Sequence, residues 1–170
     1  MTRFAFCLFA TLLCGTSFST LAAEFTQPRP GLHTGGQPAL DDLARLRAQG
    51  VRTVIDLRGS QEERGYDEAA EARRLGMEYV AMPIAGKDDL TPENAKALHA
   101  LLKQREGEVL LHCASGNRVG ALLALGAAQV DGASTEEALA LGRAAGLKSL
   151  EPAVVERLVP PKQTGNTTAD

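Results

Sequence analysis

The chain has 170 residues, of which 44% are hydrophobic and 23% are charged, so most of it can fold around one sizeable core. Its formal net charge is −3, from 18 basic and 21 acidic residues. Because no basic stripe or interleaved aromatic residues are present, the sequence lacks the electrostatic pattern of a nucleic-acid-binding protein, and we expect no nucleic-acid partner.

The first segment has the pattern of a signal peptide. Residues 1–3 are weakly basic, residues 4–13 form an apolar run, and Ala22-Ala23 supply a small residue at the cleavage position. The run is too short for a permanent membrane helix, and no later apolar run is long enough either. We therefore expect residues 1–23 to be removed, and the rest to be periplasmic or secreted without a stable membrane span.

The remaining chain alternates between helix and strand patterns. Helices are expected at 38–49, 61–75, 92–105, 119–130, from 134 onward and at 151–158. Strands are expected at 51–57, 77–84 and 108–112, with a short edge strand around 32–34. This alternation predicts one α/β domain over residues 24–159, with a central, mainly parallel sheet covered by helices on both faces. Residues 160–170 are expected to form a disordered tail.

The cysteine count is the most informative number in the composition. Cys7 and Cys14 lie in the predicted signal peptide, so Cys113 is expected to be the single cysteine of the mature chain. Exported proteins usually contain cysteines in pairs, as disulfides. A single thiol is open to oxidation, and its presence indicates a reactive role. The alternative is a small buried apolar residue.

The run after the strand at 108–112 carries the expected chemistry; it is His112-Cys113-Ala114-Ser115-Gly116-Asn117-Arg118. A turn between a strand and a helix directs several backbone N–H groups into one concavity, where they bind an anion and favour a thiolate. Residues 114–118 are therefore predicted to bind the anion, with Cys113 as nucleophile and Arg118 holding two of its oxygens. His112 is expected either to support the loop by hydrogen bonding or to be an ordinary core histidine.

The His-Cys-x-x-Gly motif resembles the cysteine-dependent phosphatases of tyrosine or dual specificity. Gly36-Gln37-Pro38, residues 51–58 and residues 78–84 are similar in order and spacing to a bacterial branch, the beta-lactamase hydrolase-like phosphatase domain. The resemblance implies a three-layer phosphatase-like fold, a phosphorylated protein or small-molecule substrate, and a phosphocysteine intermediate. It also implies an aspartic acid on a mobile loop that protonates the leaving oxygen.

Two aspartates fit the position of that acid. Asp88 and Asp89 precede Cys113 by some two dozen residues and lie next to Gly86. We favour Asp88 slightly, because it is further from Thr91, the expected cap of the next helix. The alternative is that both are first-turn charges that stabilise the helix dipole.

The loop departs from the phosphatase pattern in two ways. Four residues separate Cys113 from Arg118, whereas the phosphatases usually have five, and Val119 replaces the usual Ser or Thr. The shorter loop is similar to that of the rhodanese sulfurtransferases, which carry sulfur as a persulfide on the cysteine. However, Asp56-Leu57-Arg58 is not followed by the rhodanese Gly-His-Ile segment. We therefore place a phosphatase first, a sulfurtransferase second, and an anion-binding module with a decayed site third.

No metal or other cofactor is expected. His33 and His99 have no metal-ligand spacing with a cysteine or carboxylate.

Overall fold

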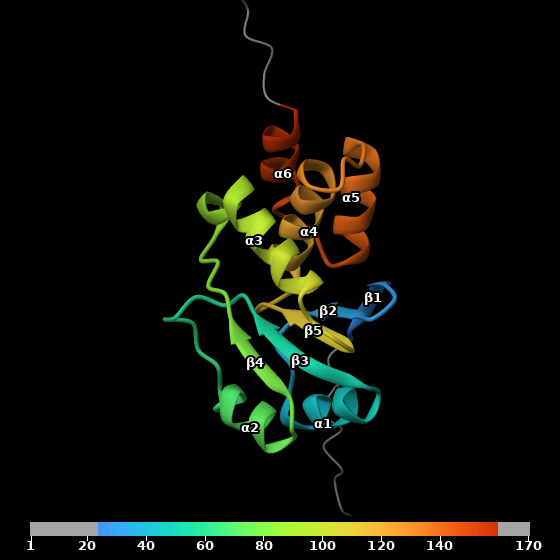
Figure 1. Ribbon diagram of the computed structural model, residues 1–170. Helices are drawn as coiled ribbons and strands as arrows, with labels where there is room; N and C mark the ends of the chain where they lie inside the picture. Colours follow the sequence, from blue (N-terminus) through green and yellow to red (C-terminus); the bar gives the residue numbers. More distant parts are fainter. Residues whose placement is uncertain (1–23, 160–170) are drawn as a thin grey trace, which may run out of the picture.

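The computed structural model describes residues 24–159; the predicted signal peptide and the predicted tail lie outside the described residues. A five-stranded sheet with the order β1-β2-β5-β3-β4 runs through the middle of the domain (Figure 1). The strands are β1 (Thr26–Arg29), β2 (Leu32–Gly35), β3 (Val51–Asp56), β4 (Glu78–Ala81) and β5 (Glu108–His112). The helices are α1 (Leu40–Ala48), α2 (Glu68–Arg74), the short 3₁₀ helix η1 (Lys87–Asp89), α3 (Pro92–Lys103), α4 (Asn117–Gln129), α5 (Thr135–Ala144) and α6 (Glu151–Leu158).

The central strand, β5, brings the Cys113 loop to the middle of the sheet. It pairs in parallel with β2 on one side and β3 on the other, whereas β1 is antiparallel to β2. The strand is apolar because both of its faces are covered, and four of its five residues are buried. In parallel sheets, ligands bind beyond the carboxyl ends of the strands, which is where Cys113 follows His112.

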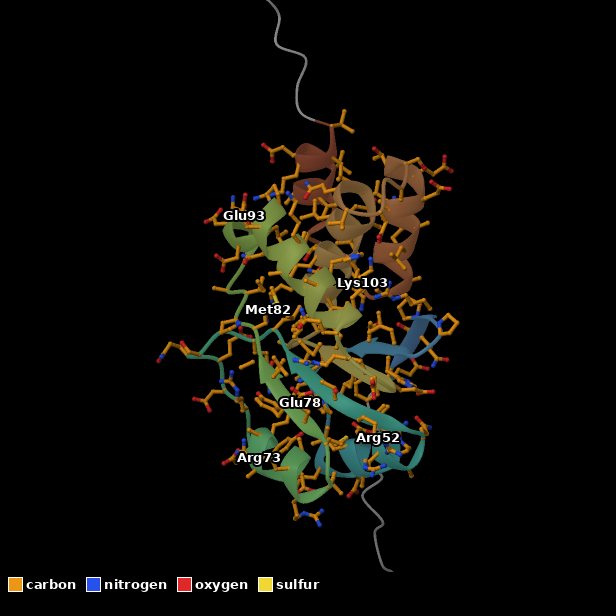
Figure 2. All side chains as sticks on the ribbon, viewed as in Figure 1. Arg52, Arg73, Glu78, Met82, Glu93 and Lys103 are labelled. Atoms are coloured by element: carbon orange, nitrogen blue, oxygen red, sulfur yellow. The ribbon has the colours of Figure 1, made fainter. Side chains whose placement is uncertain are left out.

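Helices cover both faces of the sheet, as expected for a three-layer α/β fold. Figure 1 shows α1 and α2 on one face and α3 to α6 on the other. Charged side chains such as Arg73 of α2 and Glu93 of α3 project away from the sheet (Figure 2). Helix α4 is buried along most of its length. A Cβ atom on its Gly120 would lie 2.3 Å from the Leu147 nitrogen, so this close approach requires glycine.

Two expected elements differ from the structure. The helix expected at 61–75 forms only over α2, because Gly65 has a φ of +70° and Asp67 caps the helix by accepting a hydrogen bond from the Ala70 N–H. The expected edge strand at 32–34 is β2, which lies inside the sheet because the unpredicted β1 covers it. Over residues 24–159, no helix is long and apolar enough to cross a membrane.

Candidate active site

Cys113 is fully buried at the start of the loop between β5 and α4. Its Sγ atom accepts a hydrogen bond from the Gly116 N–H at 3.1 Å. Gly116 has a φ of +85°, a left-handed conformation that other residues resist, so the glycine allows the chain to turn back over the sulfur. Helix α4 begins immediately afterwards, so its first N–H groups lie close to this turn.

The segment that follows β2 contacts the exposed part of the Cys113 loop through backbone hydrogen bonds. Ser115 forms an isolated antiparallel bridge with Gly36, and the Gln37 N–H donates to the Ala114 carbonyl at 3.3 Å. A Cβ atom on Gly36 would lie 3.0 Å from the same carbonyl oxygen, so the close contact leaves little space for a side chain. This contact gives the Gly36-Gln37 pair a structural function in supporting the loop.

The side chain of Asn117 holds a different segment of the chain. Its Oδ1 accepts hydrogen bonds from the N–H groups of Lys148 and Leu150 at 2.9 and 3.3 Å. Its Nδ2 donates to Ser149 Oγ at 2.6 Å. Asn117 therefore ties the start of α4 to the connection between α5 and α6, and only its backbone is available to the predicted anion site.

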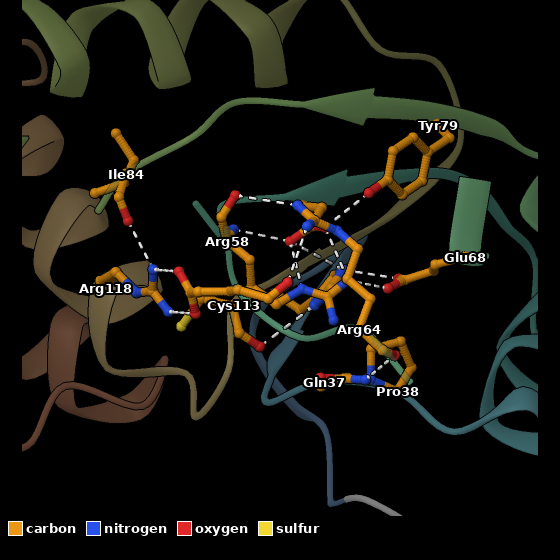
Figure 3. A network of polar contacts seen from close by, with 12 residues as sticks. Gln37, Pro38, Arg58, Arg64, Glu68, Tyr79, Ile84, Cys113 and Arg118 are labelled. Carbon is orange, nitrogen blue, oxygen red and sulfur yellow. Dashed lines mark hydrogen bonds and ion pairs between the residues drawn. The ribbon is translucent and has the colours of Figure 1, made fainter. Parts of the chain in front are cut away.

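Arg118 forms a two-pronged ion pair with Glu62 beside the thiol (Figure 3). Nη1 and Nη2 donate to the two Glu62 carboxylate oxygens at 2.5 and 2.7 Å, and Nη1 also donates to the Ile84 carbonyl at 2.7 Å. The hydrogen bond from Arg118 lowers the pKa of Glu62, and the same bond raises the pKa of Arg118. The guanidinium is therefore already bound to an anion in this structure.

Glu62 is presented by a loop with its own scaffold, residues 59–67, here called the Glu62 loop. Arg64 donates from Nη1 to the Glu62 carbonyl at 3.1 Å and from Nη2 to the Gly59 carbonyl at 3.2 Å. Gln37 Nε2 donates to the Arg64 carbonyl at 2.5 Å. The segment that supports the Cys113 loop thus also holds the Glu62 loop. By its sequence position near the carboxyl end of a strand, Glu62 could line the pocket, but an exposed charge at such a position is usually just solvated. Its pairing with Arg118 could not be predicted, because the two residues lie 56 positions apart.

Asp88 and Asp89 lie on η1, outside the hollow beside Arg118. That hollow is lined by Gly59, Ser60, Gln61, Glu62, Ala85 and Arg118. Asp89 Oδ2 accepts a hydrogen bond from the Ala85 N–H at 2.7 Å, so Asp89 holds the backbone at the rim of the hollow. Asp88 is exposed and lines a separate hollow with Lys87, Glu156 and Arg157. In this conformation, neither carboxylate lines the hollow beside Arg118.

Beneath the loop, on the α2 side of the sheet, four ionisable side chains form a cluster that is fully buried: Asp56, Arg58, Glu68 and His112, here called the buried charge cluster. Arg58 donates from Nε to Asp56 Oδ1 at 2.9 Å and from Nη2 to Asp56 Oδ2 at 2.8 Å. Arg58 Nη2 also donates to Glu68, and Glu68 Oε1 lies 2.8 Å from His112 Nε2. Figure 3 shows this network next to the Arg118 pair.

Asp56 is the most strongly hydrogen-bonded carboxylate of the cluster. Burial opposes its ionisation, but hydrogen bonds from Arg58 and Tyr79, together with the charge of His112, hold its pKa well below the usual range. Tyr79 donates its hydroxyl proton to Asp56 at 2.7 Å. Burial and then this hydrogen bond raise the pKa of Tyr79 to about 12. At neutral pH, Asp56 is therefore an ionised carboxylate, and its partner Tyr79 is a neutral phenol.

The donor set of this cluster could be considered for a metal, since ligand atoms of Asp56, Glu68 and His112 lie within 4.8 Å of one another. However, Arg58 donates hydrogen bonds to both carboxylates. A guanidinium at this position repels a second cation and already compensates the negative charge. The residues present fit an ion network better than a metal centre.

Comparison with known proteins identifies similar sequences and folds. The family model described as "Beta-lactamase hydrolase-like protein, phosphatase-like domain" matches residues 25–130. The beta-lactamase hydrolase-like protein of Xylella fastidiosa strain Temecula1 is 38% identical over 120 residues, which cover 68% of this chain and 27% of the relative. The corresponding protein of Agrobacterium fabrum is 34% identical over 101 residues, covering 57% and 23%. The chain thus spans only about a quarter of the length of these curated relatives.

Solved structures share the fold at lower sequence identity. A putative phosphatase from Neisseria meningitidis has a TM-score of 0.67 and 23% identity, covering 78% of this chain and 94% of that chain. P. aeruginosa TpbA in complex with pTyr has a TM-score of 0.54 and 19% identity, covering 81% and 88%. These structures confirm the expected three-layer, phosphatase-like α/β architecture.

Proposed function

The chain belongs to the family of the phosphatase-like domain of beta-lactamase hydrolase-like proteins, and from this membership we propose that it is a cysteine-dependent phosphatase acting on a phosphomonoester. The observation that most supports this proposal is the placement of the Cys113 thiol at the carboxyl end of the central strand, under the Gly116 N–H and beside Arg118. From the predicted signal peptide, we further propose that the reaction takes place outside the cytoplasm.

The proposed reaction has two displacements at phosphorus. Cys113 Sγ attacks the phosphorus, the bond to the leaving oxygen breaks, and a phosphocysteine forms. Arg118 and the loop N–H groups bind the phosphoryl oxygens, and an aspartic acid gives its proton to the leaving oxygen. Water then attacks the phosphocysteine and releases phosphate and the thiolate.

Asp89 is the better placed acid in this structure, because it already contacts Ala85 at the rim of the hollow. Phosphotyrosine and phosphoserine or phosphothreonine are the proposed substrate groups.

The carboxylate of Glu62 occupies one edge of the Arg118 guanidinium and competes with a phosphate for its positive charge. We therefore expect Glu62→Gln to bind inorganic phosphate roughly tenfold more tightly, because it loses a charge-assisted ion pair that competes with the anion. Titration calorimetry with inorganic phosphate measures the difference. Glu63→Gln is the matched control, since Glu63 is the exposed neighbour on the same loop. Equal affinity in wild type and Glu62→Gln would show that the carboxylate does not compete with the anion.

A second candidate function is sulfur transfer through a persulfide on Cys113. The short loop favours it, because four intervening residues supply one backbone N–H donor fewer than the usual five, and a smaller ring suits a persulfide better than a phosphate. The site geometry adds support: Arg118 is already paired with Glu62, and neither Asp88 nor Asp89 lines the hollow. A sulfurtransferase needs no general acid to protonate an ester oxygen.

Paired assays of the full chain distinguish the candidates. The phosphatase proposal predicts release of phosphate from an aryl phosphate, with Asp89→Asn slowing turnover of esters with poor leaving groups about 10²-fold or more. The rate of Asp88→Asn on the same esters is the comparison, because Asp88 lies on the same 3₁₀ turn as Asp89. The phosphatase proposal would be overturned in favour of the sulfurtransferase if the protein transferred sulfur from thiosulfate to cyanide but released no phosphate. Neither substitution should then affect the rate of sulfur transfer. Anion binding without either activity would indicate a decayed site.

A further inference from the structure

The carbonyl of Lys87, the first residue of η1, accepts a hydrogen bond from a helix that lies much later in the chain. Arg157 of α6 donates from Nη2 to this carbonyl at 2.6 Å, across 70 positions of sequence. Its Nη1 donates to the Ala153 carbonyl of α6 at 2.9 Å. The side chain is half-buried, and its planar guanidinium therefore joins α6 to η1 in a defined orientation.

The turn that Arg157 contacts is the one that carries the proposed acid, Asp89. A single 3₁₀ turn is weak by itself, because its hydrogen bonds have poorer geometry than those of an α-helix; here the Leu90 N–H donates to the Lys87 carbonyl at 3.2 Å. At the other end of the turn, Asn94 Nδ2 of α3 donates to the Asp89 carbonyl at 2.7 Å. Side chains of two other helices thus hold the two ends of η1, and together they set the position of Asp89.

Helix α6 is also connected to the loop that carries the nucleophile. Asn117 at the start of α4 accepts hydrogen bonds from the N–H groups of Lys148 and Leu150, and Leu150 is the N-cap residue of α6. Val154 of α6 is fully buried in the core. A series of direct contacts therefore runs from the anion-binding loop through α6 to η1, and Arg157 makes the last of these contacts.

We propose that Arg157 is a positioning residue for the proposed general acid, because it holds η1 in place relative to the Cys113 loop. Residue 157 lies beyond residues 25–130, which the family model matches. The proposal rests on the proposed phosphatase reaction with Asp89 as the acid. Displacement of η1 then lowers the rate chiefly for esters whose leaving oxygen must be protonated in the transition state.

The dependence of the rate on the leaving group distinguishes a misplaced acid from a general loss of structure. Arg157→Met keeps an apolar side chain of similar length and removes both donors. We expect its kcat/KM for phenyl phosphate to fall about tenfold, and its kcat/KM for 4-nitrophenyl phosphate, whose leaving group needs little protonation, to stay within about twofold of wild type. Arg143→Met is the matched control, since Arg143 donates to Glu151 of the same helix at the surface and should leave both rates unchanged.

A double variant tests whether Arg157 acts through Asp89. In the Asp89→Asn background, Arg157→Met should cause no further loss on phenyl phosphate, because no acid remains to be positioned. A further tenfold loss in that background would overturn the proposal. So would an equal loss on both esters in Arg157→Met, or the same selective loss in Arg143→Met.

Backbone ¹⁵N relaxation measures the effect on η1 without any substrate. In Arg157→Met we expect the order parameters of residues 86–89 to fall from about 0.85 to below about 0.6, with no change in Arg143→Met. Unchanged order parameters in Arg157→Met would overturn the proposal. If η1 becomes mobile as expected but the wild-type protein releases no phosphate from either ester, the proposed function fails and the role of Arg157 in holding η1 stands.

Discussion

Replacing Cys113 with serine is expected to reduce turnover of the aryl phosphate, or of thiosulfate if the sulfurtransferase is correct, by about 10³-fold or more. The physical reason is that a serine hydroxyl is far less ionised than a thiol at neutral pH and is a poorer nucleophile. Steady-state rates on both substrates measure the loss. When the reaction of the wild-type protein is quenched with acid, the peptide that contains Cys113 should carry a covalent modification, either a phosphocysteine or a persulfide. The same peptide of the variant should carry neither.

The same variant also tests whether the remaining loop binds an anion. Its N–H groups and Arg118 are unchanged, so Cys113→Ser should keep its affinity for inorganic phosphate within a fewfold of wild type. Lost binding together with lost activity would point to a collapsed loop. Full activity in the variant would exclude both enzymatic proposals, because each depends on the sulfur atom.

Replacing Arg58 with methionine is expected to destabilise the domain by about 3–5 kcal/mol. Arg58 is fully buried and donates to both Asp56 and Glu68. Methionine fills much of the space but leaves two buried carboxylates without their main cation. They must either remain charged in a medium of low polarity or take up protons. The change in the free energy of unfolding is measured by urea denaturation, monitored by far-ultraviolet circular dichroism.

Arg74→Met is the control for this loss of stability. Arg74 pairs with Glu71 on the exposed side of α2, where water solvates both charges, so little change is expected. If Arg58→Met lost no more stability than the control, the buried charge cluster would not depend on the guanidinium.

Local sequence patterns were sufficient to predict much of the structure around Cys113. The apolar strand before Cys113, the glycine turn and the helix after it are encoded within about twenty residues. Residues 61–67 show where local patterns fail. Their charged composition favours a helix, but Arg64 instead donates to the carbonyls of Gly59 and Glu62, and Gln37 holds the Arg64 carbonyl from another part of the chain. These contacts satisfy backbone groups that a helix would have paired internally.

The sequence by itself determined the fold class, and it identified Cys113 and Arg118 as the candidates for the reaction. These features follow from hydrophobic periodicity and from residue types at fixed spacing, which act over a few neighbours. Only the tertiary structure decided that Arg118 pairs with Glu62, that Asp88 and Asp89 lie outside the hollow, and that His112 meets Glu68. Each of these contacts depends on how the sheet and its connections pack, because electrostatic partners are chosen by distance in space and not by separation along the chain.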